Sequence, residues 1–150
     1  MSQTPGRIVS AVWLLLGLCV AGGCSNSNHK SVPVSGRVTL DGKPLAGATI
    51  GFEPRSFPGE ILAGPGSYGK TDADGRYELQ MITGGRGGIV ATHDVSIRTA
   101  RGGMDAATGE PIELEPERVP PAYLANGALT MTVPAEGTDA ADFKLVTKER

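Results

Sequence analysis

Apolar and polar residues alternate along the chain from position 32 onward, and this period of two is the feature that most constrains the fold. Successive side chains of a β-strand point to opposite faces, so each alternating segment predicts a strand with one buried face. No segment after position 32 has the period of about 3.6 residues that marks an amphipathic helix. We therefore expect an all-β domain of about seven strands. The apolar rows are Val32/Val34/Val38/Leu40, Ala48/Ile50/Phe52, Tyr77/Leu79/Met81, His93/Val95/Ile97, Leu129/Met131/Val133 and Phe143/Leu145.

The segments between these rows carry residues that favour turns. Residues 55–69 and 101–121 lack periodicity, so each is expected to be a long surface loop. Gly36 interrupts an apolar row, which indicates a bulge or a close approach of two backbones. Short strands separated by turns predict a β-sandwich or a small barrel. The dipeptides that favour tight turns are Asp41-Gly42, Asp74-Gly75 and Asn126-Gly127.

The alternation assigns each side chain of the expected core to a face. A register shift of one residue would exchange the inward and outward sets. His93 shares a face with Val95 and Ile97, so we expect it to be a core histidine bonded to a backbone group or to water. The inward set is Phe52, Tyr77, Leu79, Val95, Ile97, Met131, Val133, Phe143 and Leu145. The outward set is Glu78, Gln80, Thr130, Thr132 and Lys144.

Two motifs in the chain resemble a known family. The run VSGRVTLDGKPLAGATIGFEP at 34–54, followed by TDADGRYEL at 71–79, is similar to the carboxypeptidase regulatory-like domain. The segments 119–133 and 142–145 are similar to small bacterial lipoproteins of that group. The resemblance implies a Greek-key β-sandwich of the transthyretin (prealbumin) type over residues 32–147. It implies no reaction, because the members are mostly folding accessories, adhesive modules or sugar-binding candidates. Family members often carry an aromatic residue at the place of His93.

The N-terminal segment has the layout of an export signal. Arg7 precedes an apolar stretch at 8–20, which is too short for a comfortable membrane span. Three small residues follow, and then Cys24, in a pattern that resembles the lipobox of bacterial lipoproteins. The resemblance implies cleavage after a signal peptide at 1–23 and attachment of diacylglycerol to the Cys24 thiol. An uncleaved anchor and ordinary secretion are the alternatives. The polar residues 24–31 then form a lipidated tether.

Cysteine content agrees with lipidation. Cleavage before Cys24 leaves one cysteine in the mature chain, so no internal disulfide can form. Acylation protects a lone thiol that would be a liability in an oxidising compartment. Cys19 is a worse lipidation candidate, because Leu18 is too large for the cleavage site. We expect a membrane-anchored protein of the cell envelope, on the periplasmic or the surface side.

The sequence argues against several functional classes. The net charge of −2 argues against binding to a nucleic-acid backbone. A calcium loop starting at Asp72 would need an acidic ligand at Thr83, so a turn in which Asp72 and Asp74 bind backbone is favoured. The domain offers His93 no second His or Cys as a metal partner.

The sequence His93, Asp94, Ser96 does not predict a catalytic triad, because neighbouring strand residues face opposite ways. We therefore expect no catalytic residue, no cofactor and no metal. The expected function is that of a non-enzymatic envelope lipoprotein whose sandwich is a structural or protein-interaction module. Its partner is an envelope protein or a glycan.

The alternative function is a carbohydrate or small-ligand binding module. Lectin-type sites use exposed aromatic rings, and those outside the expected core are Tyr68, Tyr123 and Phe57. The acidic segment 110–117 could bind a cation or a basic partner, although we favour a solvated loop.

Overall fold

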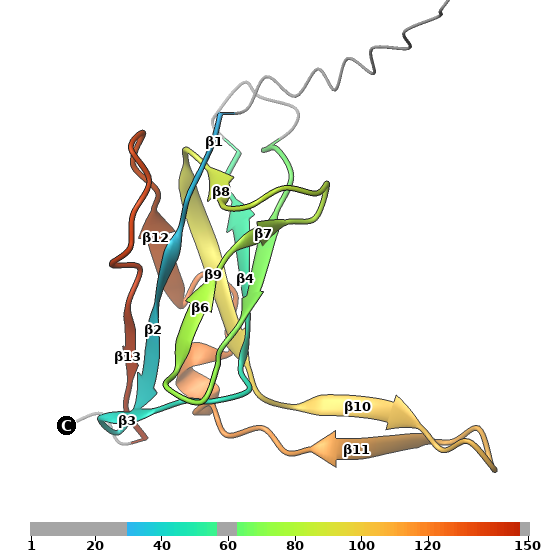
Figure 1. Cartoon of the computed structure of the whole chain (residues 1–150). Coiled ribbons are helices and arrows are strands. Elements are labelled where there is room, and N and C mark those ends of the chain that lie inside the picture. Colours follow the sequence, from blue (N-terminus) through green and yellow to red (C-terminus); the bar gives the residue numbers. More distant parts are fainter. Residues whose placement is uncertain (1–29, 57–62, 148–150) are drawn as a thin grey trace, which may run out of the picture.

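The computed structural model describes residues 30–56 and 63–147, and the predicted signal peptide with Cys24 lies outside them. Strands arranged in several sheets make up the described part (Figure 1). The one helical element there is a 3-10 turn, η1 (Pro121–Tyr123). Among the described residues no helix is long and apolar enough to cross a membrane. The prediction of an all-β protein is confirmed.

The larger sheet has five strands in the order β12-β9-β4-β5-β7, and every neighbouring pair is antiparallel. This sheet brings together segments far apart in sequence, since β4 and β9 are neighbours at its centre. Its strands are β4 (Thr49–Pro54), β5 (Ser67–Lys70), β7 (Gln80–Met81), β9 (Thr92–Arg98) and β12 (Leu129–Thr132).

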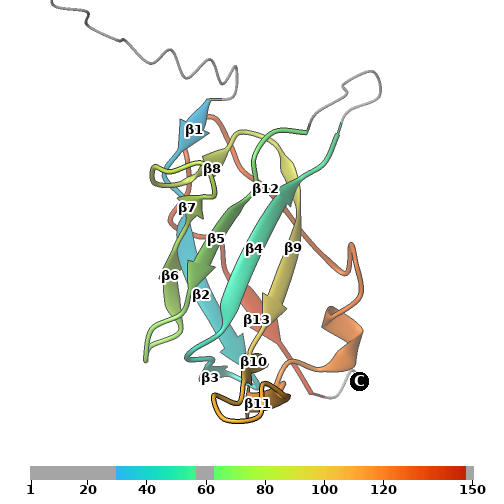
Figure 2. The same cartoon turned by 90° about the vertical axis from the view of Figure 1, so that its right-hand side faces the viewer.

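The second sheet has four strands around β2 and lies behind the first in Figure 2. The last strand pairs with β2 in parallel, whereas β3 and β6 pair with β2 antiparallel. These strands are β2 (Ser35–Leu40), β3 (Lys43–Pro44), β6 (Arg76–Glu78) and β13 (Phe143–Leu145). Two further pairs are β1 (Ser31–Val32) with β8 (Gly88–Ile89), and β10 (Arg101–Met104) with β11 (Pro111–Glu115).

The core lies between the two main sheets. Phe52 of β4 meets Phe143 of β13 edge to face, with ring centroids 6.2 Å apart. The Tyr77 hydroxyl donates a 2.6 Å hydrogen bond to the carbonyl of Ala141, which joins β6 to the chain just before β13. Every predicted inward residue is buried except Met131, which is half-buried and packs against the core. The five predicted outward side chains are exposed. The predicted register is therefore confirmed.

Glycines and aspartates form the turns as expected. Asp41 and Gly42 both have positive φ, at 50° and 78°, and they connect β2 to β3. The Asp72 carboxylate accepts the amides of Asp74 and Arg76 at 2.9 Å, which is the backbone-binding turn predicted there. After this turn the chain passes from one sheet to the other, because β6 pairs with β2 in the second sheet and β7 pairs with β5 in the larger sheet.

Gly36 marks a close approach of two backbones, as predicted. A Cβ atom added at this position would lie 2.1 Å from the carbonyl oxygen of Ala141. The neighbouring residue supports the same contact, since the Arg37 amide donates to Asp142 Oδ1 at 2.8 Å. Glycine therefore allows the segment before β13 to reach β2.

Three predictions about the strands were wrong. Residues 101–121 are no loop, because they contain the hairpin β10–β11 and the turn η1. The predicted loop 55–69 ends earlier, since β5 begins at Ser67. The described residues form thirteen strand segments in place of about seven, because several short segments of two or three residues are too short to show a period.

Candidate functional site

The hairpin β10–β11 projects from the body of the protein (Figure 1), and it brings several large exposed apolar side chains together on one element. We call residues 101–115 the arm. Among the described strands, β10 and β11 pair only with each other. Three of the arm's large apolar side chains are open to solvent: Met104 is 66% exposed, Leu114 52% and Ile112 39%. Exposed apolar side chains grouped on one element mark interaction sites more often than scattered ones do.

Pairing in the arm places Ile112 and Leu114 on one face. Gly103 lies opposite Ile112, and the register shifts between Arg101 and Gly102. A Cβ atom at Gly103 would lie 2.9 Å from Leu114 Cδ1, so the Leu114 side chain rests on the glycine. Met104 lies on the other face, because adjacent strand residues alternate. The arm thus exposes apolar groups on both faces.

The arm is acidic. It carries one basic and four acidic side chains, a net charge of −3. Arg101 pairs with Glu115 at 3.1 Å, whereas Glu110 and Glu113 form no ion pair within the described part of the chain. The fourth acid, Asp105, accepts the amides of Ala107 and Thr108 at 2.8 and 2.9 Å and closes the tip of the hairpin.

A polar cluster, in which Thr99 is buried and Glu117 is half-buried, holds the root of the arm. Glu117 Oε1 accepts the amide and the hydroxyl of Thr99 at 3.0 and 2.9 Å, and the amide of Val119 at 2.9 Å. The Thr99 hydroxyl in turn accepts the Arg118 amide at 2.6 Å. We call Thr99 and Glu117 the root clamp, because they join the chain before β10 to the chain after β11.

The electrostatics of Glu117 fit this role. Partial burial raises the pKa of Glu117, but the hydrogen bonds from Thr99, Val119 and Ala100 outweigh it, so the pKa lies below the usual value of 4.5. The carboxylate is therefore charged at neutral pH. In the sequence Glu117 belongs to the acidic segment interpreted as a solvated loop, and no pattern there predicts the clamp.

A hollow of about 340 Å³ lies on the larger sheet, next to the place where β12 begins. β12 pairs with β9 only from Thr92 to Val95, so the next residues of β9 have no strand on that side. The turn at 123–127 lines the hollow instead. Its polar side chains include Glu53, Asp94, Ser96 and Arg98. This hollow could accommodate a small polar ligand.

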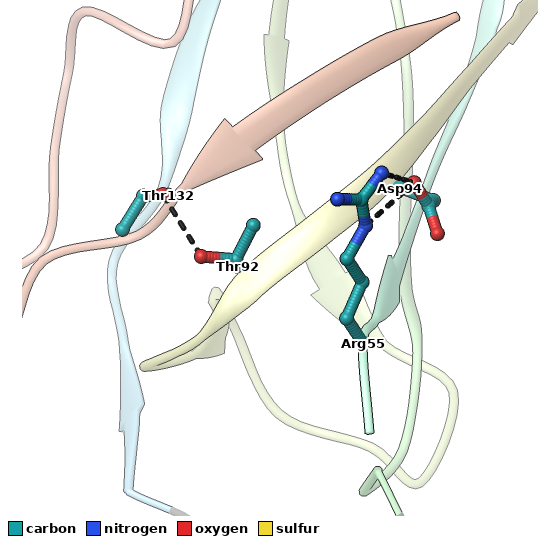
Figure 3. A network of polar contacts seen from close by, with 4 residues as sticks. All are labelled: Arg55, Thr92, Asp94 and Thr132. Atoms are coloured by element: carbon teal, nitrogen blue, oxygen red, sulfur yellow. Dashed lines mark hydrogen bonds and ion pairs between the residues drawn. The ribbon is translucent and has the colours of Figure 1, made fainter. Parts of the chain in front are cut away.

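The outer face of the same sheet carries a polar network (Figure 3). Arg55 donates two hydrogen bonds to Asp94 Oδ1, from Nε at 2.9 Å and from Nη2 at 2.6 Å. These contacts lower the pKa of Asp94. Thr92 and Thr132 share a 3.0 Å hydrogen bond between β9 and β12. All four side chains are at least partly open to solvent. The Asp94 carboxylate is therefore occupied by a guanidinium, which suits a structural role better than proton transfer.

His93 lies in the core, as predicted. Its ring packs against Phe52 with centroids 5.5 Å apart, and Nδ1 donates to the carbonyl of Ala91 at 3.1 Å. Nε2 has no hydrogen-bond partner in the described structure. Burial lowers the pKa of His93, so the imidazole is neutral at neutral pH.

The other candidate residues lie apart from one another. Asp94 is on the sheet face opposite to His93, so the two cannot form a catalytic pair. Tyr68 is half exposed on β5, and Tyr123 is half-buried in η1. In residues 30–56 and 63–147, no three His, Cys, Asp or Glu side chains converge as metal ligands would. Cys24, His29 and Phe57 lie outside the described residues.

The residues at the tip of the arm carry the sequence signal that predicts a hairpin there. Asp105 followed by Thr108-Gly109 is a turn signal, because an aspartate carboxylate readily accepts nearby amides. The strands themselves gave little signal, since Gly102 and Gly103 have no side chains to alternate.

Comparison with known proteins places the chain in no family. No family model matches it, and no curated protein matches it. Among solved structures it is similar to part of a 9R-lipoxygenase from Cyanothece PCC8801, at 13% sequence identity and a TM-score of 0.38. The match covers 77% of this chain and 16% of that chain. At this level the likeness carries no functional argument.

Proposed function

We propose that this protein is a non-enzymatic lipoprotein of the cell envelope whose β domain binds another envelope protein through the arm. The observation that carries the proposal is the arm, a projecting hairpin with three exposed apolar side chains and a hydrogen-bonded root. A two-stranded hairpin gains little stability in water by itself, so one that is held by hydrogen bonds at its root and carries an apolar surface suits a docking element.

The anchor in this proposal is Cys24, supported by the apolar stretch 8–20 and the small residues before the cysteine. The described chain begins beside β1, and the arm projects near the other end of the body (Figure 1). A lipid at Cys24 would therefore be attached near the end of the body opposite to the arm (Figure 1). Lipid chains at one end and a docking element at the other fit a protein that holds a partner near the membrane surface.

We also propose that the fold is a Greek-key sandwich of the transthyretin type, as in carboxypeptidase regulatory-like domains. Support comes from the two main sheets, whose aromatic side chains Phe52 and Phe143 meet in the core. The parallel pairing of β13 with β2 adds further support, because it brings the last strand beside an early one.

In-cell photo-crosslinking tests the proposed docking role. A photoreactive phenylalanine analogue replaces Leu114 on the arm, and in the matched control it replaces Ile82, an exposed apolar residue of the body. We expect a specific adduct with an envelope protein from position 114 and none from position 82. Adducts of equal yield from both positions would contradict the proposal.

The anchor is tested separately by fractionation. Cys24→Ser is expected to release the protein from the membrane fraction or to leave it unprocessed, because the acyl chains can no longer be attached. Mass spectrometry of the unaltered mature protein should show an acylated N-terminal Cys24. A mature chain that still contains Trp13 would contradict lipidation.

One observation favours the alternative of carbohydrate binding. Tyr68 is 49% exposed and lies opposite Gly51, which leaves its ring uncovered on the face of the larger sheet. A sugar ring stacks readily on such an aromatic surface. A glycan array would detect this activity, and Tyr68→Ala should abolish any signal that depends on the sheet face.

A further inference from the structure

We infer that the arm takes up an extended segment of a partner protein, rich in basic and apolar side chains, as an additional β-strand along β10. This inference rests on the proposed docking function and names the partner's chemistry and mode of binding. Strand addition needs an accessible edge, free backbone groups and side chains that complement the partner.

β10 offers the free backbone groups. The Asp105 amide donates to the Glu110 carbonyl at 2.8 Å, which makes this pair a hydrogen-bonded one. Hydrogen-bonded and non-bonded pairs alternate along an antiparallel ladder. Gly103 therefore points its backbone groups toward β11, whereas Gly102 and Met104 direct their N–H and C=O groups away from it. These outward groups form an unpaired edge.

The two edges of the arm differ. By the same alternation, Pro111 and Glu113 direct their backbone toward the free edge of β11. Proline has no N–H to donate, so this edge is partly blocked. The β10 edge carries no proline, and Gly102 presents no side chain that could shield its backbone. A partner strand is therefore directed to β10.

The side chains of the arm define the partner's composition. Ile112 and Leu114 offer an apolar surface, while Glu110 and Glu113 lack ion-pair partners among the described residues. A second copy of the arm would bring the same charge of −3 and would be repelled. An anionic membrane surface would be repelled as well. A strand that alternates apolar and basic residues can set its apolar side chains on the face of Ile112 and Leu114 and its basic side chains on the face of Glu113.

The root clamp favours binding of this kind. Glu117 and Thr99 fix the chain on both sides of the arm, and Asp105 closes its tip. A hairpin held at both ends loses less conformational freedom when a strand is added, so less of the binding free energy is spent on ordering.

The test uses the full-length protein in neutral detergent micelles and two synthetic peptides of eight residues. One peptide alternates Val with Lys, and the other alternates Val with Glu. We expect only the lysine peptide to bind in fluorescence anisotropy, with an affinity that falls as salt is raised. Hydrogen exchange should slow at the amides of Gly102 and Met104. Glu110→Gln with Glu113→Gln should weaken binding several-fold.

A pair of variants at one position separates backbone from side-chain contributions. Met104→Pro removes an outward amide and leaves the hairpin ladder intact, so we expect affinity to fall about three- to tenfold. Met104→Ala keeps the amide, so its affinity for the peptide should fall by less. Unchanged exchange at Ile112 would show that the hairpin persists in the proline variant.

Three results would overturn the inference: equal affinity for both peptides, protection at β7 or β12 in place of β10, or an arm-dependent dimer in sedimentation. Failure here is distinguishable from failure of the proposed function. If position 114 crosslinks to a protein in cells while the lysine peptide does not bind, docking stands and strand addition falls.

Discussion

At the scale of single residues, Phe52 is a side chain that connects the two sheets. Its ring is fully buried on β4 and packs against Phe143 of β13 and the neutral ring of His93. Truncation would remove both contacts and leave a cavity. Phe52→Ala should lower the free energy of unfolding by about 3–5 kcal/mol. Thr130→Ala, on an exposed side chain of β12, should change it by less than about 1 kcal/mol. Urea titrations of the two variants measure the difference, and equal small effects would contradict the assigned faces.

Gly36 is a residue whose size is strictly limited by neighbouring backbone. Gly36→Ala would place Cβ 2.1 Å from the Ala141 carbonyl oxygen, and backbone cannot move aside as a side chain can. We expect a loss of about 1–3 kcal/mol, as for other overpacked sites. Gly102→Ala is the matched control, because its new Cβ would meet nothing closer than 3.7 Å. Thermal unfolding of both variants tests this, and an unaffected Gly36→Ala would show that β2 and the 139–142 segment are not in contact.

At the level of elements, the root clamp makes the order of the arm depend on pH. The pKa of Glu117 is lowered in the folded protein. The clamp therefore stabilises the arm above the unfolded-state pKa near 4.5, and this contribution is lost as the pH falls through the lower folded-state pKa. Amide exchange in the arm, corrected for intrinsic rates, should thus be faster at low pH than at pH 7.

Glu117→Gln provides the control for this prediction. The variant should show faster exchange in the arm at pH 7 and should lose most of the pH dependence, because glutamine does not titrate. Exchange in β4 and β9 should stay unchanged, since the clamp lies outside the larger sheet. A pH dependence that survives the substitution would assign the effect to other carboxylates, Asp105 first.

The elements that could be predicted from sequence are those with one buried face. In β9 and β13 buried and exposed residues alternate, and burial of one face is what produces the period of two. β5 was missed because its buried positions hold Ser67 and Gly69, while Tyr68 points outward. The arm was missed because it packs on no core, so neither face had to be apolar. The acidic segment was noticed, but the contact between Glu117 and Thr99 spans 18 residues and has no sequence signal.

At the scale of the whole molecule, pairing between distant segments decides whether the domain folds as one unit. The last strand lies beside β2, and the Arg37–Asp142 hydrogen bond joins residues 105 positions apart. At the other end, β1 pairs with β8. Both cysteines precede residue 30, so a fragment 30–147 has no disulfide to hold it together. Its stability must come from the core between the sheets.

We therefore expect fragment 30–147 to unfold in a single cooperative transition in urea, with a midpoint that does not respond to reductant or chelator. Fragment 30–138 lacks β13, and with it Phe143 and Leu145 of the core. Loss of two large buried side chains costs a free energy comparable to the whole stability of a small domain, which is about 5–15 kcal/mol. Circular dichroism should find this shorter fragment unfolded. A cooperative transition retained without β13 would mean that the larger sheet folds independently of the second one.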